Sequence, residues 1–142
     1  MKISTRGRYA LSFMIDLAQQ GRSGYIPLKD ISERQGISIK YLEQITALLS
    51  KFGLLQSIRG PQGGYRLAKD SSEYTVGEIL RTTEGNLEPV DYSEDEVASS
   101  EQTINTATAK MWAGLGKVVN EYLDSITLDS LVYNSGTQDY VI

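Results

Sequence analysis

Apolar residues recur at helical spacing along three segments in the N-terminal half of the chain. The predicted helices run over about Arg8–Gln20, Leu28–Gln35 and Ser38–Phe52. Gly36 supplies a left-handed terminus for the second helix, and Ser38 is a good N-cap for the third. Their expected buried faces consist of Leu11, Met14, Ile15 and Ala18, of Leu28 and Ile31, and of Leu42, Ile45, Leu49 and Phe52.

The segment after the third helix predicts a β-hairpin. Leu54–Arg59 and Tyr65–Leu67 are typical of short strands, and the glycine-rich loop 60–64 joins them. Two short helices separated only by Gly36 and Ile37 form a helix-turn-helix, which many helical proteins contain. A helix-turn-helix followed directly by a glycine-rich hairpin is more specific. It predicts a winged helix, a fold class that is mainly α with a small β wing.

The rest of the chain divides into four expected parts. A capping box at Thr75–Glu78 begins the last helix of a winged helix-turn-helix domain over 1–85. Residues 86–99 are acidic and lack periodicity, which indicates a linker or effector loop. A long helix and a short following helix are expected over 100–132, and residues 133–142 are expected to form a mobile tail.

A heptad seam marks the long helix, which is expected to end at about Leu123. Its six seam positions are separated alternately by four and three residues, as in a coiled coil, and further apolar positions widen the face. The seam consists of Ile104, Thr108, Met111, Leu115, Val118 and Tyr122, with Trp112, Val119 and Leu123 beside it. This stripe exceeds what one small domain can cover, so it predicts a dimerisation helix; the alternative is a helix folded back on its own domain.

Composition narrows the possible chemistry. The chain has no cysteine and no histidine, which excludes disulfides, thiolate catalysis, Ser–His relays and nearly all zinc sites. The acidic run Glu94–Glu96 favours a solvated surface over an ion site, because consecutive residues rarely converge on one cation. No metal or cofactor is therefore expected. No stretch approaches the ~20 apolar residues of a spanning helix, and no secretory signal is recognised, so we expect a cytoplasmic protein without a membrane partner.

Charge is distributed unevenly along the chain. Residues 1–69 carry a net charge of +7 and residues 70–142 a net charge of −11, which together give −4. This segregation indicates that one half meets a polyanion, such as double-stranded DNA, and that the other half does not.

The third helix carries candidate DNA contacts near its N-terminal end, where recognition helices read base edges. Gln44 suits adenine, Glu43 suits the amino group of cytosine, and Ser38 suits either a base or a phosphate. Lys40 and Tyr41 suit phosphate contacts. For each of these residues the alternative is a solvated helix face.

Arg59 is the strongest single candidate, because the loop 60–64 exposes it at the tip of the wing. An arginine on a narrow hairpin suits insertion into a minor groove, together with Gly60 and Gln62 of the loop. The basic start of the chain suits phosphate contacts through Lys2, Thr5, Arg6 and Arg8.

Several motifs also match a known family. They are Met1–Leu11, Ile37–Ile45, Ile58–Leu67, Val76–Leu80 and Asp124–Leu128. Over nearly its whole length the chain resembles the bacterial Rrf-two regulators, the family of IscR, NsrR and CymR. The resemblance implies a homodimer that binds partly palindromic promoter DNA, with the recognition helix in the major groove and the wing arginine in the minor groove. It assigns these contacts to Ser38, Lys40, Tyr41, Glu43 and Arg59.

The chain departs from the iron–sulfur members of that family, which carry three cysteines in the loop that here spans about 91–106. Without thiolates a cluster has no normal ligands. The resemblance is therefore nearest to the cluster-free branch typified by CymR, which implies a repressor of cysteine and sulfur-metabolism genes controlled by complex formation with a cysteine-synthesis enzyme.

Other interpretations stay open at this point. One is a cysteine-substituted or degenerate cluster regulator, and another is a winged-helix protein-interaction module, against which the +7 half and Arg59 argue. An enzyme is disfavoured, because the loop 60–64 lacks the Lys-Ser/Thr and the helix that complete a phosphate-binding loop.

Overall fold

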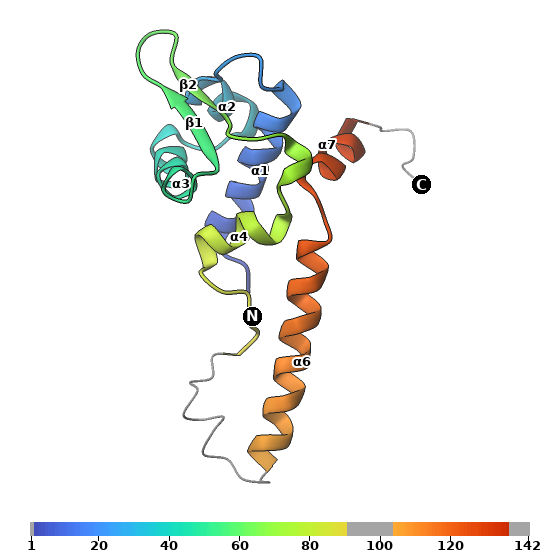
Figure 1. Cartoon of the computed structure of the whole chain (residues 1–142). Helices are drawn as coiled ribbons and strands as arrows, with labels where there is room; N and C mark the ends of the chain where they lie inside the picture. Colours follow the sequence, from blue (N-terminus) through green and yellow to red (C-terminus); the bar gives the residue numbers. More distant parts are fainter. Residues whose placement is uncertain (1, 91–103, 137–142) are drawn as a thin grey trace.

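The computed structural model describes residues 2–90 and 104–136, and it has the expected architecture of helices with one small wing (Figure 1). The elements are α1 (Thr5–Gln20), α2 (Leu28–Gln35), α3 (Ile39–Lys51), β1 (Leu55–Ile58), β2 (Gly64–Leu67), the 3₁₀ helix η1 (Ser71–Glu73), α4 (Val76–Glu84), α6 (Ile104–Asp124) and α7 (Leu128–Gly136). The winged-helix prediction is confirmed. The first residues expected for the long helix, 100–103, and the acidic run Glu94–Glu96 lie outside the described residues.

Helix α1 begins three residues earlier than predicted and is turned relative to its expected face. Ser4 is the N-cap, and its Oγ accepts a hydrogen bond of 3.0 Å from the Gly7 N–H. The fully buried apolar side chains of α1 are Ala10, Phe13, Met14 and Leu17, whereas the predicted Leu11, Ile15 and Ala18 are only half-buried. The helix is packed on several sides, by α2, α3, α4, α7 and β2, so it buries more than one stripe.

Helices α2 and α3 match the predicted helix-turn-helix closely. Gly36 adopts the left-handed conformation, with φ 68°, and Ser38 caps α3 by accepting from the Tyr41 N–H. The prediction that Phe52 is buried is wrong. It lies just beyond the last helical residue and is 56% exposed, while Thr46 is buried instead.

A buried carboxylate joins α1 to α2, which the hydrophobic pattern did not indicate. Asp16 is 1% exposed and accepts two bonds from the guanidinium of Arg34, at 2.7 and 3.1 Å, and a third from the Gln35 side chain at 2.9 Å. The hydrogen bond to Asp16 raises the pKa of Arg34. This bidentate pair fixes the angle between the two helices.

The wing is a two-stranded antiparallel sheet in which Leu55 pairs with Leu67 and Ile58 pairs with Gly64. A short bridge between Ile26 and Tyr65 adds a third piece of backbone to its edge.

Tyr74 secures the base of the wing. Its buried hydroxyl donates to the Leu54 carbonyl at 2.7 Å and accepts from the Ala68 and Lys69 N–H groups. Burial raises the pKa of Tyr74, which keeps this hydroxyl protonated.

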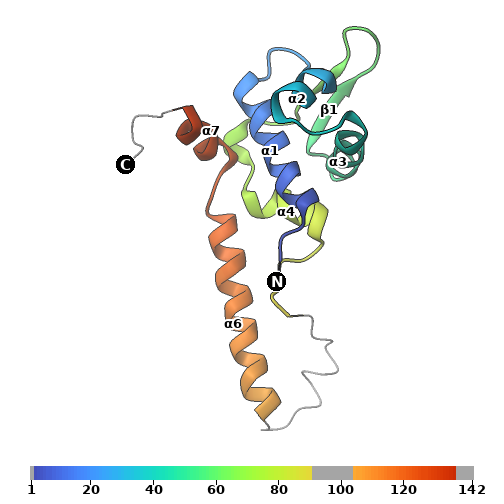
Figure 2. The same ribbon diagram turned by 180° about the vertical axis from the view of Figure 1, so that it is seen from behind.

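Helix α6 extends away from the other elements, and α7 returns to lie beside α1 (Figures 1 and 2). Leu128, at the start of α7, is fully buried in the main core. Helix α7 continues to Gly136, so the first four residues of the expected tail are helical rather than irregular. At α4, the Thr75 side chain caps the Glu78 N–H as predicted, but the other half of the expected capping box does not form. The Glu78 carboxylate lies 3.3 Å from Lys69 Nζ instead.

Candidate nucleic-acid interface

The N-terminal half of α3 presents a polar surface. Ser38, Lys40, Glu43 and Gln44 are all exposed, and the buried Leu42, Ile45 and Leu49 hold the opposite side of the helix against the core. The Ser38 hydroxyl also caps the helix, with 3.1 Å between its Oγ and the Tyr41 nitrogen. This face has donors and acceptors free to meet base edges and phosphates.

Tyr41 is half-buried, because its ring packs edge-on against Tyr9 of α1, with 5.6 Å between the ring centroids. This contact places the first turns of α1 beside α3. Arg8 and Thr5 are exposed there, and Arg8 donates to the Thr5 hydroxyl at 3.1 Å. Sequence reasoning missed Tyr9, which is 38% exposed. Its only signal was an aromatic residue within the basic N-terminal run.

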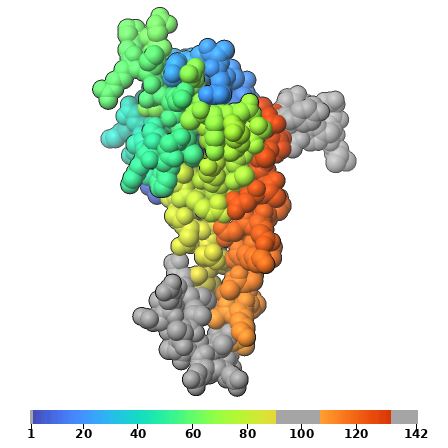
Figure 3. Space-filling view, in the orientation of Figure 1, coloured from blue at the N-terminus to red at the C-terminus, as the bar shows by residue number. Residues whose placement is uncertain are grey.

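The wing loop projects from the surface (Figure 3). The Gly63 N–H donates to the Gly60 carbonyl at 2.8 Å, and Gly60 has a φ of 108° that disfavours any side chain. A Cβ on Gly63 would collide with the Ile58 carbonyl oxygen. Arg59 and Gln62 are both exposed. Arg59 therefore lies at the start of the loop that joins β1 to β2, and its side chain is exposed.

Two further arginines, Arg22 and Arg66, connect the base of the wing to the loop after α1. Arg22 donates to the Leu67 and Ala68 carbonyls, each at 3.1 Å. Arg66 lies 4.5 Å from the centroid of the Tyr25 ring and donates to Gln56 and to the Arg22 carbonyl. Sequence reasoning counted both arginines in the basic half but did not anticipate that they tie the wing to the loop after α1.

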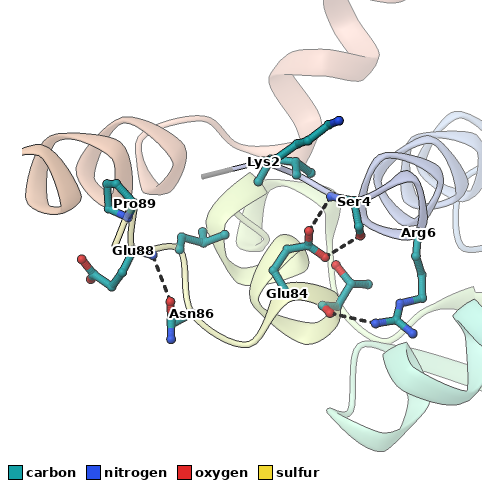
Figure 4. Close-up of a pocket in the computed structure, with 10 residues that line it drawn as sticks. Lys2, Ser4, Arg6, Glu84, Asn86, Glu88 and Pro89 are labelled. Carbon is teal, nitrogen blue, oxygen red and sulfur yellow. Dashed lines mark hydrogen bonds between the residues drawn. The ribbon is translucent and has the colours of Figure 1, made fainter. Parts of the chain in front are cut away.

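Lys2 and Arg6 line a polar cavity of about 460 Å³ between the N-terminus and the end of α4 (Figure 4). Arg6 donates to the Thr83 carbonyl at 3.3 Å, and Glu84 and Glu88 lie on the same cavity wall. These two predicted phosphate contacts are exposed, as Arg8 and Arg59 are, but they line a cavity together with carboxylates.

Glu84 anchors the start of the chain. Its carboxylate accepts from the Ser4 backbone N–H at 2.6 Å and from the Ser4 hydroxyl at 2.8 Å (Figure 4). Burial raises the pKa of Glu84, but the bonds from Ser4 and Thr83 and the charge of Arg6 outweigh it, so the net pKa is below its ordinary value.

The Rrf2 family model, described as "Iron-dependent Transcriptional regulator", matches residues 3–134. The chain belongs to the Rrf2 family. It is 40% identical over 134 residues to the HTH-type transcriptional regulator IscR of Serratia proteamaculans (strain 568), a match that covers 94% of this chain and 80% of that protein.

Solved Rrf2-type structures agree with the fold. The chain is 39% identical to CymR, the global cysteine regulator of B. subtilis, with a TM-score of 0.80 over 94% of this chain and 98% of that chain. It is 39% identical to IscR of T. potens, with a TM-score of 0.76 over 100% and 93%. This Rrf2 protein is therefore a DNA-binding transcriptional regulator rather than an enzyme.

An iron–sulfur cluster, which the iron-dependent description of the family implies, does not fit the residues of this Rrf2 protein. Clusters are held mainly by cysteine thiolates, and the 142-residue sequence has no cysteine and no histidine. Over 2–90 and 104–136, no group of three acidic, histidine or cysteine side chains is arranged to hold a metal ion. In the same ranges no helix is both long and apolar enough to cross a bilayer.

Helix α6 of this Rrf2 protein exposes the predicted seam. Met111, Leu115, Val118 and Tyr122 are 50%, 40%, 62% and 64% exposed, which is unusual for large apolar side chains on one stripe. Thr108, Trp112 and Val119 are already half-buried within the single chain, and Leu123 packs on Val76, Leu80 and Leu87. The Ile104 side chain lies outside the described residues. The helix thus has one face toward its own domain and another that is uncovered.

Proposed function

We propose that this protein is a homodimeric repressor of cysteine and sulfur-metabolism genes that acts without an iron–sulfur cluster. Each protomer of the dimer inserts α3 into the major groove and Arg59 into the minor groove of partly palindromic promoter DNA. The observation that carries the DNA-binding mode is the exposed polar start of α3 beside a glycine-rich wing that presents Arg59. The uncovered seam of α6 supports the dimer, because pairing two copies removes four large apolar side chains of each copy from water.

The similarity to the cysteine regulator CymR and the lack of any cluster ligand support the cluster-free branch. We further propose that a cysteine-synthesis enzyme is the co-regulator, as the resemblance to that branch implies. The second candidate is an IscR-type regulator that has lost its cluster ligands. The names of its relatives favour this candidate, since these are IscR proteins.

The experiment is selection of genomic fragments by the purified protein, followed by affinity measurements on the selected operator and on random DNA at two salt concentrations. Fragments upstream of cysteine and sulfur-metabolism genes support the proposal, whereas a set of selected fragments without such genes favours the second candidate. Binding is expected to weaken steeply with salt, because Lys and Arg side chains release counterions from phosphates. Equal affinity for operator and random DNA, or no binding to either, contradicts the proposal.

A further inference from the structure

Arg81 of α4 forms a polar junction with the C-terminal end of α6. Its guanidinium donates to both carboxylate oxygens of Asp124, each at 2.8 Å, and to the side-chain oxygen of Asn120 at 2.7 Å. Asn120 in turn donates to the Gly116 carbonyl at 2.8 Å and to the Leu87 carbonyl at 3.2 Å. One planar fork therefore holds two successive turns of α6 and, through Asn120, the segment that follows α4.

Close packing surrounds this junction. A Cβ on Gly77, one turn before Arg81 on α4, would collide with the Asp124 carboxylate. The Asp124 side chain of α6 therefore packs directly against the backbone of α4. Gly116 is likewise buried against Glu88 and Pro89. The crossing of α4 and α6 is thus specified by hydrogen bonds and by two glycines, rather than by apolar contacts alone.

Because the junction lies near one end of α6, a small change in the crossing angle of α4 and α6 displaces the other end of α6 considerably. The junction holds α6 near its C-terminal end, while the seam continues toward the end that extends away from the domain (Figure 1). Met111 lies 13 residues before Asp124, which is ~20 Å along a helix. A change of about 10° in the crossing angle displaces that part of the seam by ~3.5 Å. The base-pair step of B-DNA is ~3.4 Å, so such a change is large enough to alter which half-site separation a dimer fits.

We propose that Arg81 is a positioning residue for DNA recognition: by fixing the angle between α6 and the winged-helix domain, it sets the half-site spacing that the dimer accepts. This inference rests on the proposed function, because it requires two copies paired through α6. Lysine cannot replace Arg81, since a single ammonium group does not reproduce the planar fork that meets Asp124 and Asn120 together. Without the fork, the two DNA-binding domains of a dimer swing relative to each other and tolerate several spacings.

The test uses the full chain and duplexes that carry the selected operator with its half-sites moved together or apart by one or two base pairs. The wild type is expected to show a sharp affinity optimum at one spacing. Arg81→Lys is expected to flatten the profile, reducing the ratio between the best spacing and the poorest by at least fivefold. Dimer formation and binding to an isolated half-site stay unchanged, because the seam and α3 are intact.

Lys69→Gln is the matched control. Lys69 pairs with Glu78 of the same helix α4 at comparable side-chain exposure, but this pair does not reach α6. Its profile is expected to follow the wild type. Asn120→Ala removes the bond from Arg81 to Asn120 but keeps the pair with Asp124, and it is expected to flatten the profile partly. If Arg81→Lys does not fold, Asn120→Ala tests the role of the junction by itself.

The outcomes separate the two proposals. A wild type that is monomeric, or that does not prefer the operator, contradicts the proposed function. A wild type that dimerises and binds but has no preferred spacing contradicts the role of Arg81. So does a sharp optimum that survives in both Arg81→Lys and Asn120→Ala.

Discussion

Arg59 is exposed beside a closed turn, in which the Gly63 N–H donates to the Gly60 carbonyl, while Arg22 and Arg66 connect the other end of the wing to the loop after α1. We expect Arg59→Ala to lower operator affinity by about 1–3 kcal/mol per wing, and up to twice that in a dimer whose wings act independently. The measurement compares operator with random DNA at two salt concentrations. Lys117→Ala, which removes an exposed cation from α6, is the control and should leave both affinities unchanged.

An equal loss on operator and random DNA would make Arg59 a phosphate anchor rather than a reader of the groove. No loss on either would remove the wing from the mechanism. The free energy of unfolding should change by less than about 0.5 kcal/mol, because Arg59 is exposed.

Glu84 makes the stability of the N-terminal anchor dependent on pH. Its pKa is lowered in the folded protein, so the stabilisation from the Ser4–Glu84 bonds is present above the ordinary glutamate value of 4.5 and is lost as the pH falls through the folded value. We expect Glu84→Gln to reduce the free energy of unfolding most at neutral pH, with the difference from the wild type shrinking on acidification. Urea unfolding of both proteins at neutral pH and below pH 4.5 measures it.

Other carboxylates are present in both proteins, so the comparison isolates Glu84. Asp124, whose pKa is lowered mainly by its hydrogen bond from Arg81, contributes equally to each. A difference that stays constant, or grows, as the pH falls would contradict the anchoring role.

At the scale of the element, the proposed dimer depends on α6. Leu115 lies in the middle of the uncovered seam, and Leu115→Asp would bury an unpaired charge in any interface formed there. We expect this variant to be monomeric by light scattering at micromolar concentration while the wild type is dimeric. Ala113→Asp is the matched control, since Ala113 is exposed on the same helix but lies outside the heptad seam. If both variants remain dimeric, the interface lies elsewhere on the molecule.

At the scale of the whole molecule, the absence of thiolates separates this chain from cluster-binding regulators. We expect anaerobic reconstitution with iron and sulfide to leave the protein colourless and its operator affinity unchanged, because the sequence offers no cysteine or histidine ligand. Visible absorption together with iron analysis checks this. A stoichiometric cluster with visible absorbance would contradict the cluster-free proposal.

The sequence by itself determined the local features of this protein. The N-cap at Ser38, the left-handed Gly36 and the strands on either side of the loop 60–64 follow from residues a few positions apart. Helix capping, turn conformation and hydrophobic periodicity are short-range effects, so the order of the elements and the winged-helix fold were predictable. The exposed start of α3 and the exposed Arg59 were predictable for the same reason.

Only the tertiary structure decided which groups meet across the chain. Asp16 is buried because Arg34 and Gln35 of another helix reach it, and Arg81 meets Asp124 although 43 residues separate them. Phe52 is exposed because α3 ends just before it, and packing on several sides turns α1 away from its expected face. These contacts depend on how the helices cross in space, and periodicity along one helix carries no information about its partner.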